Sequence, residues 1–128
     1  MRSLAREAVF KFIFSKLFNQ QDEGLFDVLT KELSSDDKKF ANEILTSLND
    51  NYDIFLNKLS DLAINFKFDR IINADKCAIL IGMAEYTIFP KTPVAIIIDE
   101  AVNLSVKYST ESSSKFVNGI LAEFVKRN

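Results

Sequence analysis

The chain has 128 residues, of which 48% are hydrophobic and 27% charged, and its formal net charge is −2. This length and apolar content are typical of one globular domain and exclude a largely disordered chain. The chain has no histidine and a single cysteine, which excludes the commonest zinc ligand and an internal disulfide. The longest run without a polar residue, 77–84, is too short to span a bilayer. We therefore predict a cytoplasmic protein with no cofactor, no metal and no membrane partner.

No residue pattern in the chain supports catalysis. The three glycines lie far apart, so a glycine-rich phosphate loop is absent. The acidic pairs 36–37 and 99–100 are adjacent in sequence. Neighbours on a helix point in directions about 100° apart, so neither pair converges on one substrate atom. We predict that the chain is not an enzyme.

Apolar residues recur every three or four positions along most of the chain, which predicts an all-α fold of about six to seven helices. Two helices are expected over 3–18 and about 24–33. The clearest helix is expected over 36–66. Ser34 or Ser35 precedes it and two aspartates occupy its first turn, where a hydroxyl and negative charge suit the exposed N–H groups.

Three more helices are expected in the second half of the chain. Asn73 can cap the first of them, which stops before a proline. The next begins at Thr92-Pro93, with the threonine as cap and the proline at the first helical position, and runs to about Tyr108. The β-branched cluster 94–98 could instead form a buried strand, but the helical period beyond it favours a helix. The last helix begins in the serine run at 112–114.

Short linkers separate these helices, and one break is more pronounced than the others. It lies at 67–72. We therefore predict a single domain of two packed helical subdomains, an N-terminal one over about 1–66 and a C-terminal one over about 67–128.

Positive charge is concentrated at the two ends of the chain. Residues 1–18 carry a net charge of +3 and residues 115–128 carry +2, whereas residues 19–114 carry −7. If the first and last helices lie together, they form a positive patch on an acidic body, and such a patch binds phosphate. The alternative is that both basic ends are simply solvated.

The first expected helix carries a second apolar ridge in addition to its ordinary inward face. Phe10, Phe14 and Phe18 recur at every fourth position, well away from the centre of that face. A helix that is apolar nearly all round is typically buried on several sides. We expect this helix to lie between the two subdomains. The alternative is that part of the ridge binds a partner.

The start of the last helix combines serines, a lysine and a phenylalanine over residues 112–116. Free N–H groups, hydroxyls and the ammonium of Lys115 could hold a phosphate there. An exposed Phe116 could stack on a base. A serine cap and a core phenylalanine are the simpler interpretation of the same residues.

Four blocks in this order resemble the NusB family of bacterial transcription antitermination factors. They are Arg2-Ser-Leu-Ala-Arg-Glu-Ala8, Asp75 with Glu85, Asp99-Glu-Ala-Val-Asn-Leu104 and Lys115-Phe-Val-Asn-Gly-Ile-Leu121. The resemblance is collinear from residue 2 to about 125. It implies an all-α fold of two packed helical subdomains. It also implies binding of the boxA segment of nascent ribosomal RNA together with NusE, a small-subunit ribosomal protein. The complex would join the RNA polymerase elongation complex with other Nus factors and suppress termination.

Position by position, the resemblance implies roles for individual residues. Arg6 is expected to contact RNA, and Arg2 and Lys11 belong to the same basic opening. The stretch before Val-Asn-Gly is expected to touch RNA through Ser113, Lys115 and Phe116. On the NusE-facing surface, the expected acidic residues are Asp75 and Glu85.

Two other functions fit the same helical pattern. One is a non-enzymatic helical protein-interaction module without RNA binding, which an RNA titration separates from an antitermination factor. The other is a methyltransferase, because some ribosomal RNA cytosine methyltransferases begin with a NusB-like domain. A methyltransferase needs a separate catalytic domain, which we do not expect in a chain that ends at Asn128.

Overall fold

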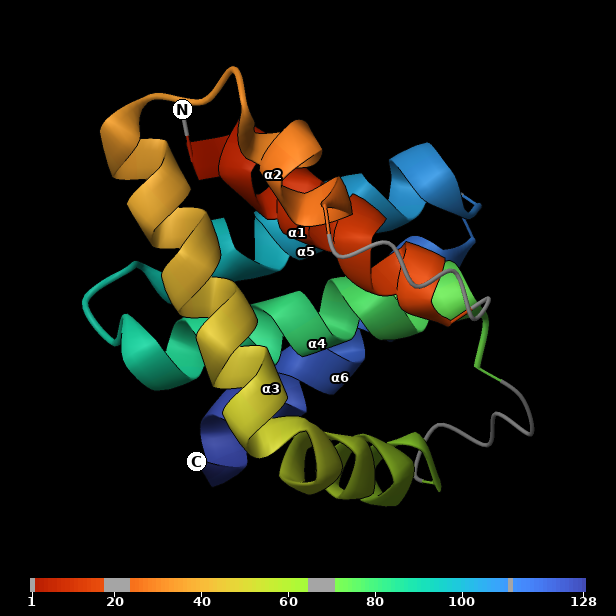
Figure 1. The fold of residues 1–128 in the computed structure, drawn as a ribbon. Helices are drawn as coiled ribbons and strands as arrows, with labels where there is room; N and C mark the ends of the chain where they lie inside the picture. The colour runs from red at the N-terminus through yellow and green to blue at the C-terminus, as the bar shows by residue number, and fades with distance from the viewer. Residues whose placement is uncertain (1, 18–23, 65–70, 111) are drawn as a thin grey trace.

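The computed structural model describes residues 2–17, 24–64, 71–110 and 112–128 (Figure 1). These residues form helices and no strand, which confirms the predicted all-α class. The helices are α1 (Arg2–Lys16), α2 (Leu25–Thr30), α3 (Ser35–Ile64), α4 (Asn73–Ile88), α5 (Val94–Tyr108) and α6 (Ser113–Arg127). Within the described ranges, no helix has both the length and the apolar character needed to cross a membrane. The predicted border between subdomains at 66–67 lies outside the described residues.

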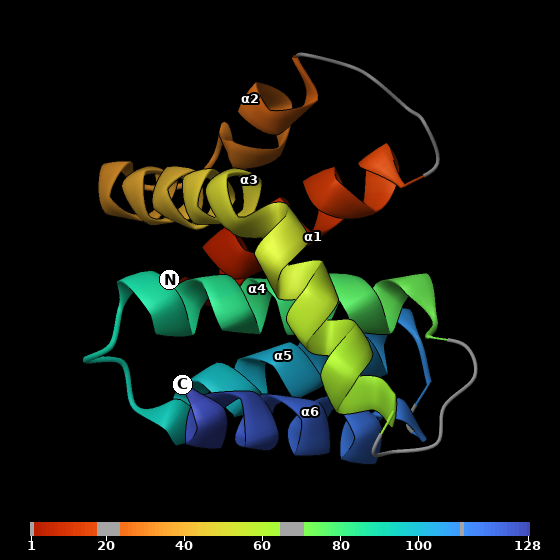
Figure 2. The same cartoon turned by 90° about the horizontal axis from the view of Figure 1, so that it is seen from below.

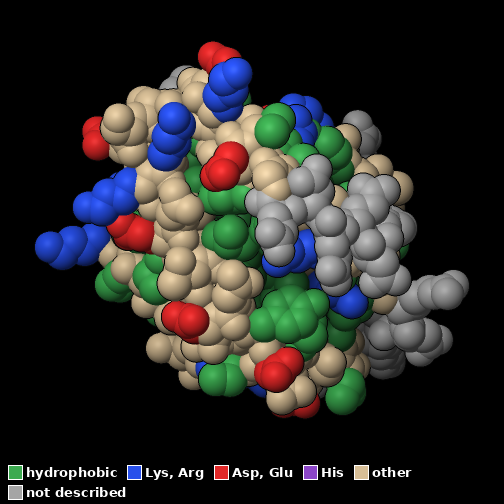
Figure 3. Space-filling view, in the orientation of Figure 1, with side chains coloured by type: hydrophobic (Ala, Val, Ile, Leu, Met, Phe, Trp, Pro, Cys, Tyr) green, Lys and Arg blue, Asp and Glu red, His purple; other side chains and the backbone are tan. Residues whose placement is uncertain are grey.

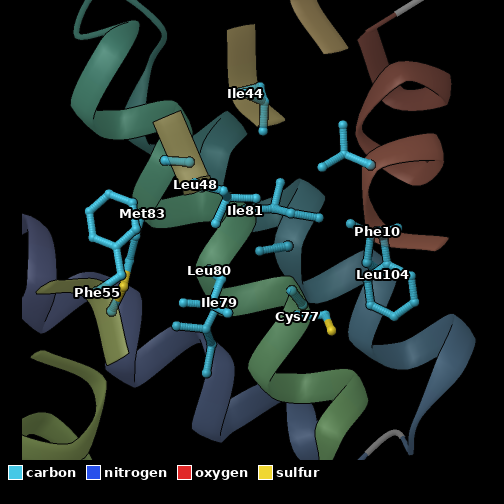
Figure 4. Packing of buried hydrophobic residues seen from close by; sticks show 14 of the residues in the cluster. Phe10, Ile44, Leu48, Phe55, Cys77, Ile79, Leu80, Ile81, Met83 and Leu104 are labelled. Carbon is cyan, nitrogen blue, oxygen red and sulfur yellow. The ribbon is translucent and has the colours of Figure 1, made fainter. Parts of the chain in front are cut away.

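Helix α4 forms the centre of the molecule, with α1 and α3 on one side and α5 and α6 on the other (Figure 2). Every residue from Cys77 to Glu85 is buried. Such a helix, apolar on all its faces, is stable only when neighbours surround it. Figure 4 shows its side chains packed among those of α3, α1 and α5. Burial raises the pKa of the Cys77 thiol to about 12, so this cysteine is an inert core residue.

Helix α1 also has neighbours on several sides, since it packs on α2, α3, α4 and α5. Phe10 is buried and stacks on Tyr108 of α5, with 4.8 Å between the ring centroids. On another side, Phe12 meets Phe26 of α2 edge to face. The expectation that the apolar ridge of this helix is buried is therefore confirmed for Phe10, whereas Phe18 lies outside the described residues.

The starts of the helices agree only in part with the sequence. Ser34 caps α3 as expected, because its Oγ accepts a hydrogen bond from the N–H of Asp37 at 3.2 Å. The cap predicted at Thr92 is wrong: Pro93 is itself the cap, and its carbonyl accepts from the N–H groups of Ile96 and Ile97. The cap predicted at Asn73 is also wrong, because this residue is already helical. Extended backbone at the preceding residue begins each of these two helices without a side-chain cap.

Helix α3 bends in its middle, which its periodicity does not reveal. Asn51 has φ −119° and ψ 15°, outside the helical region. Its side-chain amide donates to the carbonyl of Ser47 at 2.9 Å, and such bonds compete with the helical ladder. The bend lets the second half of α3 reach α6 as well as α4 (Figure 2).

The first and last helices do not form the joint patch that their charges suggested. Helix α6 packs on α5, α4 and α3, and the layer of α4 and α5 separates it from α1 (Figure 2). On the face shown in Figure 3, basic and acidic side chains are interspersed over α3. The basic residues of α1 and those of α6 are therefore not brought together by close packing of these two helices.

Gly82 provides a test of the central packing. A Cβ at this position would lie 2.8 Å from Cδ1 of the buried Leu121 on α6, closer than carbon atoms can approach. We expect Gly82→Val to lower the free energy of unfolding by about 1–3 kcal/mol. The matched variant Gly119→Val, at a half-exposed position of α6, should change it by less than about 0.5 kcal/mol, in line with helix propensity. Urea denaturation measures both, and equal effects would contradict the close contact of α4 with α6.

Candidate functional site

The side chain of Arg6 lies inside the protein and joins three helices. It projects from α1, and only 3% of the residue is exposed. Its Nε and Nη2 donate to the two carboxylate oxygens of Glu85 on α4, each at 2.6 Å. Its Nη1 lies 3.2 Å from Oε1 of Glu100 on α5. We call these three residues the Arg6 cluster.

The Arg6 cluster has a geometry that stabilises a buried ion pair strongly. Two N–H groups of the planar guanidinium each bind one oxygen of the same carboxylate. A lysine ammonium could not make this paired contact. Glu85 is only 1% exposed, so its charge depends on Arg6 for compensation. Ser3, one turn before Arg6, donates to Oε1 of Glu100 as well. The start of α1 is thereby fixed against both α4 and α5.

A second polar contact ties α1 to the far end of α5. Glu7 accepts hydrogen bonds from the ammonium of Lys107 and the hydroxyl of Tyr108. The bond from Lys107 lowers the pKa of Glu7, whereas burial is the main cause that raises the pKa of Tyr108. The Glu7 contact therefore contributes to stability at neutral pH and loses that contribution as the pH falls through the lowered pKa.

These contacts leave a groove between α1 and α5. Ser3 faces Glu100 and Glu7 faces Lys107, so the two helices run in the same direction side by side. The α1–α5 groove has walls from Ser3, Leu4 and Glu7 on one helix and from Glu100, Asn103, Leu104 and Lys107 on the other. The lining residues of α5 extend from Glu100 to Lys107, so the groove is about 10 Å long at 1.5 Å per residue.

The predicted RNA-binding residues divide into an exposed and a buried set. Arg2, Lys11 and Lys115 are exposed. The guanidinium of Arg2 lies over the rings of Phe40 and Phe89, 4.5 and 5.4 Å from their centroids, so it is held at one end of the α1–α5 groove. Helix α6, which carries Lys115 in its first turn, begins beyond the other end, where Ser113 is hydrogen-bonded to Ser109.

Arg6, Ser113 and Phe116 form the buried set. The hydroxyl of Ser113 lies within hydrogen-bond distance of Thr110 and Ser109, and Phe116 belongs to the hydrophobic core. In this conformation none of the three side chains faces solvent as an RNA contact requires. For Ser113 and Phe116 the reason is that α6 turns this side toward α4 and α5, as its apolar period alone indicates. Arg6 is instead turned inward by its contacts with Glu85 and Glu100.

The predicted partner-binding carboxylates are also internal. Asp75 is buried in the first turn of α4 and accepts a hydrogen bond from the hydroxyl of Ser105 on α5 at 2.6 Å. Glu85 is occupied by Arg6. Both residues connect α4 to its neighbours, so in this conformation neither presents a carboxylate to a second protein.

Several residues that build the groove are not among the predicted site residues. Glu7 and Glu100 belong to the blocks that carry the family resemblance, but no role is predicted for them, and Lys107 lies in none of these blocks. The spacing of Glu100, Asn103 and Lys107 places them on one face of a helix, but that pattern is equally typical of a solvated face. Among the described residues there is no group of three metal-ligating side chains that could hold a metal ion.

Comparison with known proteins agrees with this arrangement of helices. The model of the NusB family matches residues 2–126. The chain belongs to the NusB family. The transcription antitermination protein NusB of Methylacidiphilum infernorum is 31% identical to it, over 98% of this chain and 90% of the relative. That of Natranaerobius thermophilus is 32% identical, over 94% and 91%.

Solved structures of the NusB family have the same fold. NusB from T. maritima superposes with a TM-score of 0.85 at 27% identity, covering 98% of this chain and 91% of that one. A crystal structure of the antitermination factors NusB and NusE in complex with dsRNA gives 0.83 at 23% identity, covering 99% and 97%. The shared fold includes the crossing of α1 over α4 on which the Arg6 cluster is built.

The Arg6 cluster predicts an effect on stability. Arg6→Ala leaves the buried carboxylate of Glu85 without its partner, so we expect the free energy of unfolding to fall by about 3–5 kcal/mol. Arg2→Ala, one turn earlier on the surface, removes a contact with two rings and should cost about 0.5–1 kcal/mol. Urea denaturation of both variants measures the difference. An Arg6→Ala variant as stable as Arg2→Ala would show that the cluster does not hold the helices together.

Proposed function

We propose that this protein is a transcription antitermination factor that binds boxA of nascent ribosomal RNA together with NusE. The observation that carries the proposal is membership of the NusB family over residues 2–126, with curated relatives described as antitermination proteins. In this proposal the protein binds RNA and NusE and catalyses no reaction. In this proposal it acts in the cytoplasm, within an RNA polymerase elongation complex that contains other Nus factors.

The α1–α5 groove supports RNA binding in particular. Arg2 lies at one end of it, and Lys107 with the start of α6 lies at the other. Among the predicted RNA-binding residues, Arg2, Lys11 and Lys115 are the exposed cations, so these three can meet phosphates. Arg6, Glu85 and Asp75 have a different role in this proposal, because they position the helices that carry these cations.

The protein has a weak electrostatic attraction for RNA on its own, which favours a joint site with a partner. Its net charge is −2, and few exposed cations lie along the groove, whereas specific nucleic-acid sites usually neutralise more phosphates. A basic ribosomal protein such as NusE would add positive charge, and the acidic middle of the chain, residues 19–114, would attract it.

Binding of RNA by the protein alone is the first test. If Arg2, Lys11 and Lys115 each neutralise one phosphate of a single strand, the slope of log affinity against log salt should be roughly −2. Lys115→Ala should reduce the magnitude of the slope by about 0.7. Lys126→Ala, at the opposite end of α6 and also exposed, is the control and should leave it unchanged.

Fluorescence anisotropy with a boxA RNA and a scrambled RNA of the same length measures these slopes. We expect weak binding with a preference for boxA. Absence of binding at low salt, or equal affinity for both RNAs, would favour the alternative of a protein-interaction module without RNA binding.

The joint site predicts coupling between the two partners. We expect NusE to bind the chain one to one and to tighten boxA binding ten-fold or more, which corresponds to about 1.4 kcal/mol. By linkage, boxA must tighten NusE binding by the same factor. Titration calorimetry in both orders measures the two factors. Binding of NusE that leaves the RNA affinity unchanged would contradict a shared surface.

A further inference from the structure

A cavity opens at the end of the α1–α5 groove where Arg2 lies. Its volume is about 820 Å³, within the range of about 300–1,000 Å³ that is usual for small-molecule sites. The link between α4 and α5, residues 88–93, forms one wall, and Ile96 and Glu100 of α5 form another. The wall residues are mostly apolar, among them Phe89, Pro90 and Pro93. This cavity shares Ser3 and Glu100 with the groove and is therefore continuous with it.

The cavity is lined by charged residues of both signs, which differ in exposure. The lining cations Arg2 and Lys91 are exposed at the mouth. The half-buried Glu100 uses one carboxylate oxygen, Oε1, for Ser3 and Arg6. No described residue donates a hydrogen bond to its other oxygen, Oε2. Since the Arg6 cluster has two carboxylates and one guanidinium, the wall formed by Glu100 favours a ligand that donates a hydrogen bond.

One class of ligand matches all of these features. A nucleotide has a flat base that fits between apolar walls. Some bases carry an amino group at the edge, which can donate to a carboxylate, and the phosphate of the nucleotide can bind the exposed cations. An acidic peptide would place its charge against Glu100, and a basic peptide would place its charge against Arg2 and Lys91. Charge complementarity thus favours a nucleotide over either peptide.

We propose that this cavity binds one unstacked base of the RNA strand that lies in the α1–α5 groove. The base amino group donates to Oε2 of Glu100, and the adjoining phosphate lies between Arg2 and Lys91. Arg2 is already held over the rings of Phe40 and Phe89, so little side-chain freedom is lost on binding. The inference rests on the proposed RNA binding, and it adds that one position of the RNA is recognised through its base.

The test combines a scan of the RNA with two matched protein variants. Single abasic sites are placed in turn along a boxA RNA, and the affinity of the full chain for each RNA is measured by fluorescence anisotropy. In the unsubstituted protein we expect one position at which removal of the base weakens binding by about ten-fold, the size typical of losing one stacked base.

Ile96→Glu and Val106→Glu then locate that base. Both side chains belong to α5 and are 46% and 41% exposed, so both variants should fold, and both add the same charge. Ile96 lines the cavity, whereas Val106 lines neither the cavity nor the groove. The abasic penalty at the sensitive position should vanish in Ile96→Glu and remain about ten-fold in Val106→Glu.

A change in the RNA alone provides a second test that does not depend on a variant. At the sensitive position, a base without its exocyclic amino group should bind the unsubstituted protein several-fold more weakly than the same base with that group. An abasic penalty of equal size in both variants, or no sensitive position, would overturn the cavity as a base site while RNA binding stands. Absence of any RNA binding at low salt would overturn the proposed function and this inference together.

Discussion

The arrangement of the helices depends on the ion pair of Arg6 with Glu85 inside the protein. Two charges are costly to bury, and they are tolerated here because the guanidinium contacts both carboxylate oxygens at 2.6 Å and reaches Glu100 in addition. These contacts require α1, α4 and α5 to meet at one point and in one register. The direction in which α1 crosses the core, and hence the place of Arg2 on the surface, follows from that requirement.

The α1–α5 groove is a consequence of the same contacts. Helix α1 packs broadly on α3 and α4. Its contact with α5 is narrower and combines polar groups near Ser3, Arg6 and Glu7 with the stacking of Phe10 on Tyr108. Polar side chains bridge the two helices at Ser3 and at Glu7, and the α1–α5 groove is lined by these same residues. The two arginines at the start of the chain thus have different places. Arg6 secures α1 from inside the protein, and Arg2 lies at one end of the α1–α5 groove.

Much of the fold could be predicted from the sequence, since apolar residues recur with the helical period in α3, α5 and α6. Helices α5 and α6 begin within two residues of the expected positions, because a proline and a serine run mark their starts. The site was harder to predict. Arg6 and Glu85 are 79 positions apart, and nothing local shows that either is buried. A resemblance to a family identifies which arginines matter, but only the packing of α1 on α4 shows which of them faces inward.

The central claim is that Arg6 is an internal anchor in the free protein and remains one when RNA is bound. The direct measurement is the nuclear magnetic resonance signal of its Nε–H group in arginine-labelled protein, with and without boxA RNA. The account predicts a signal that exchanges slowly with water and hardly moves on RNA addition, while the signal of Arg2 shifts. Fast exchange in the free protein, or a shift of the Arg6 signal as large as that of Arg2, would contradict it.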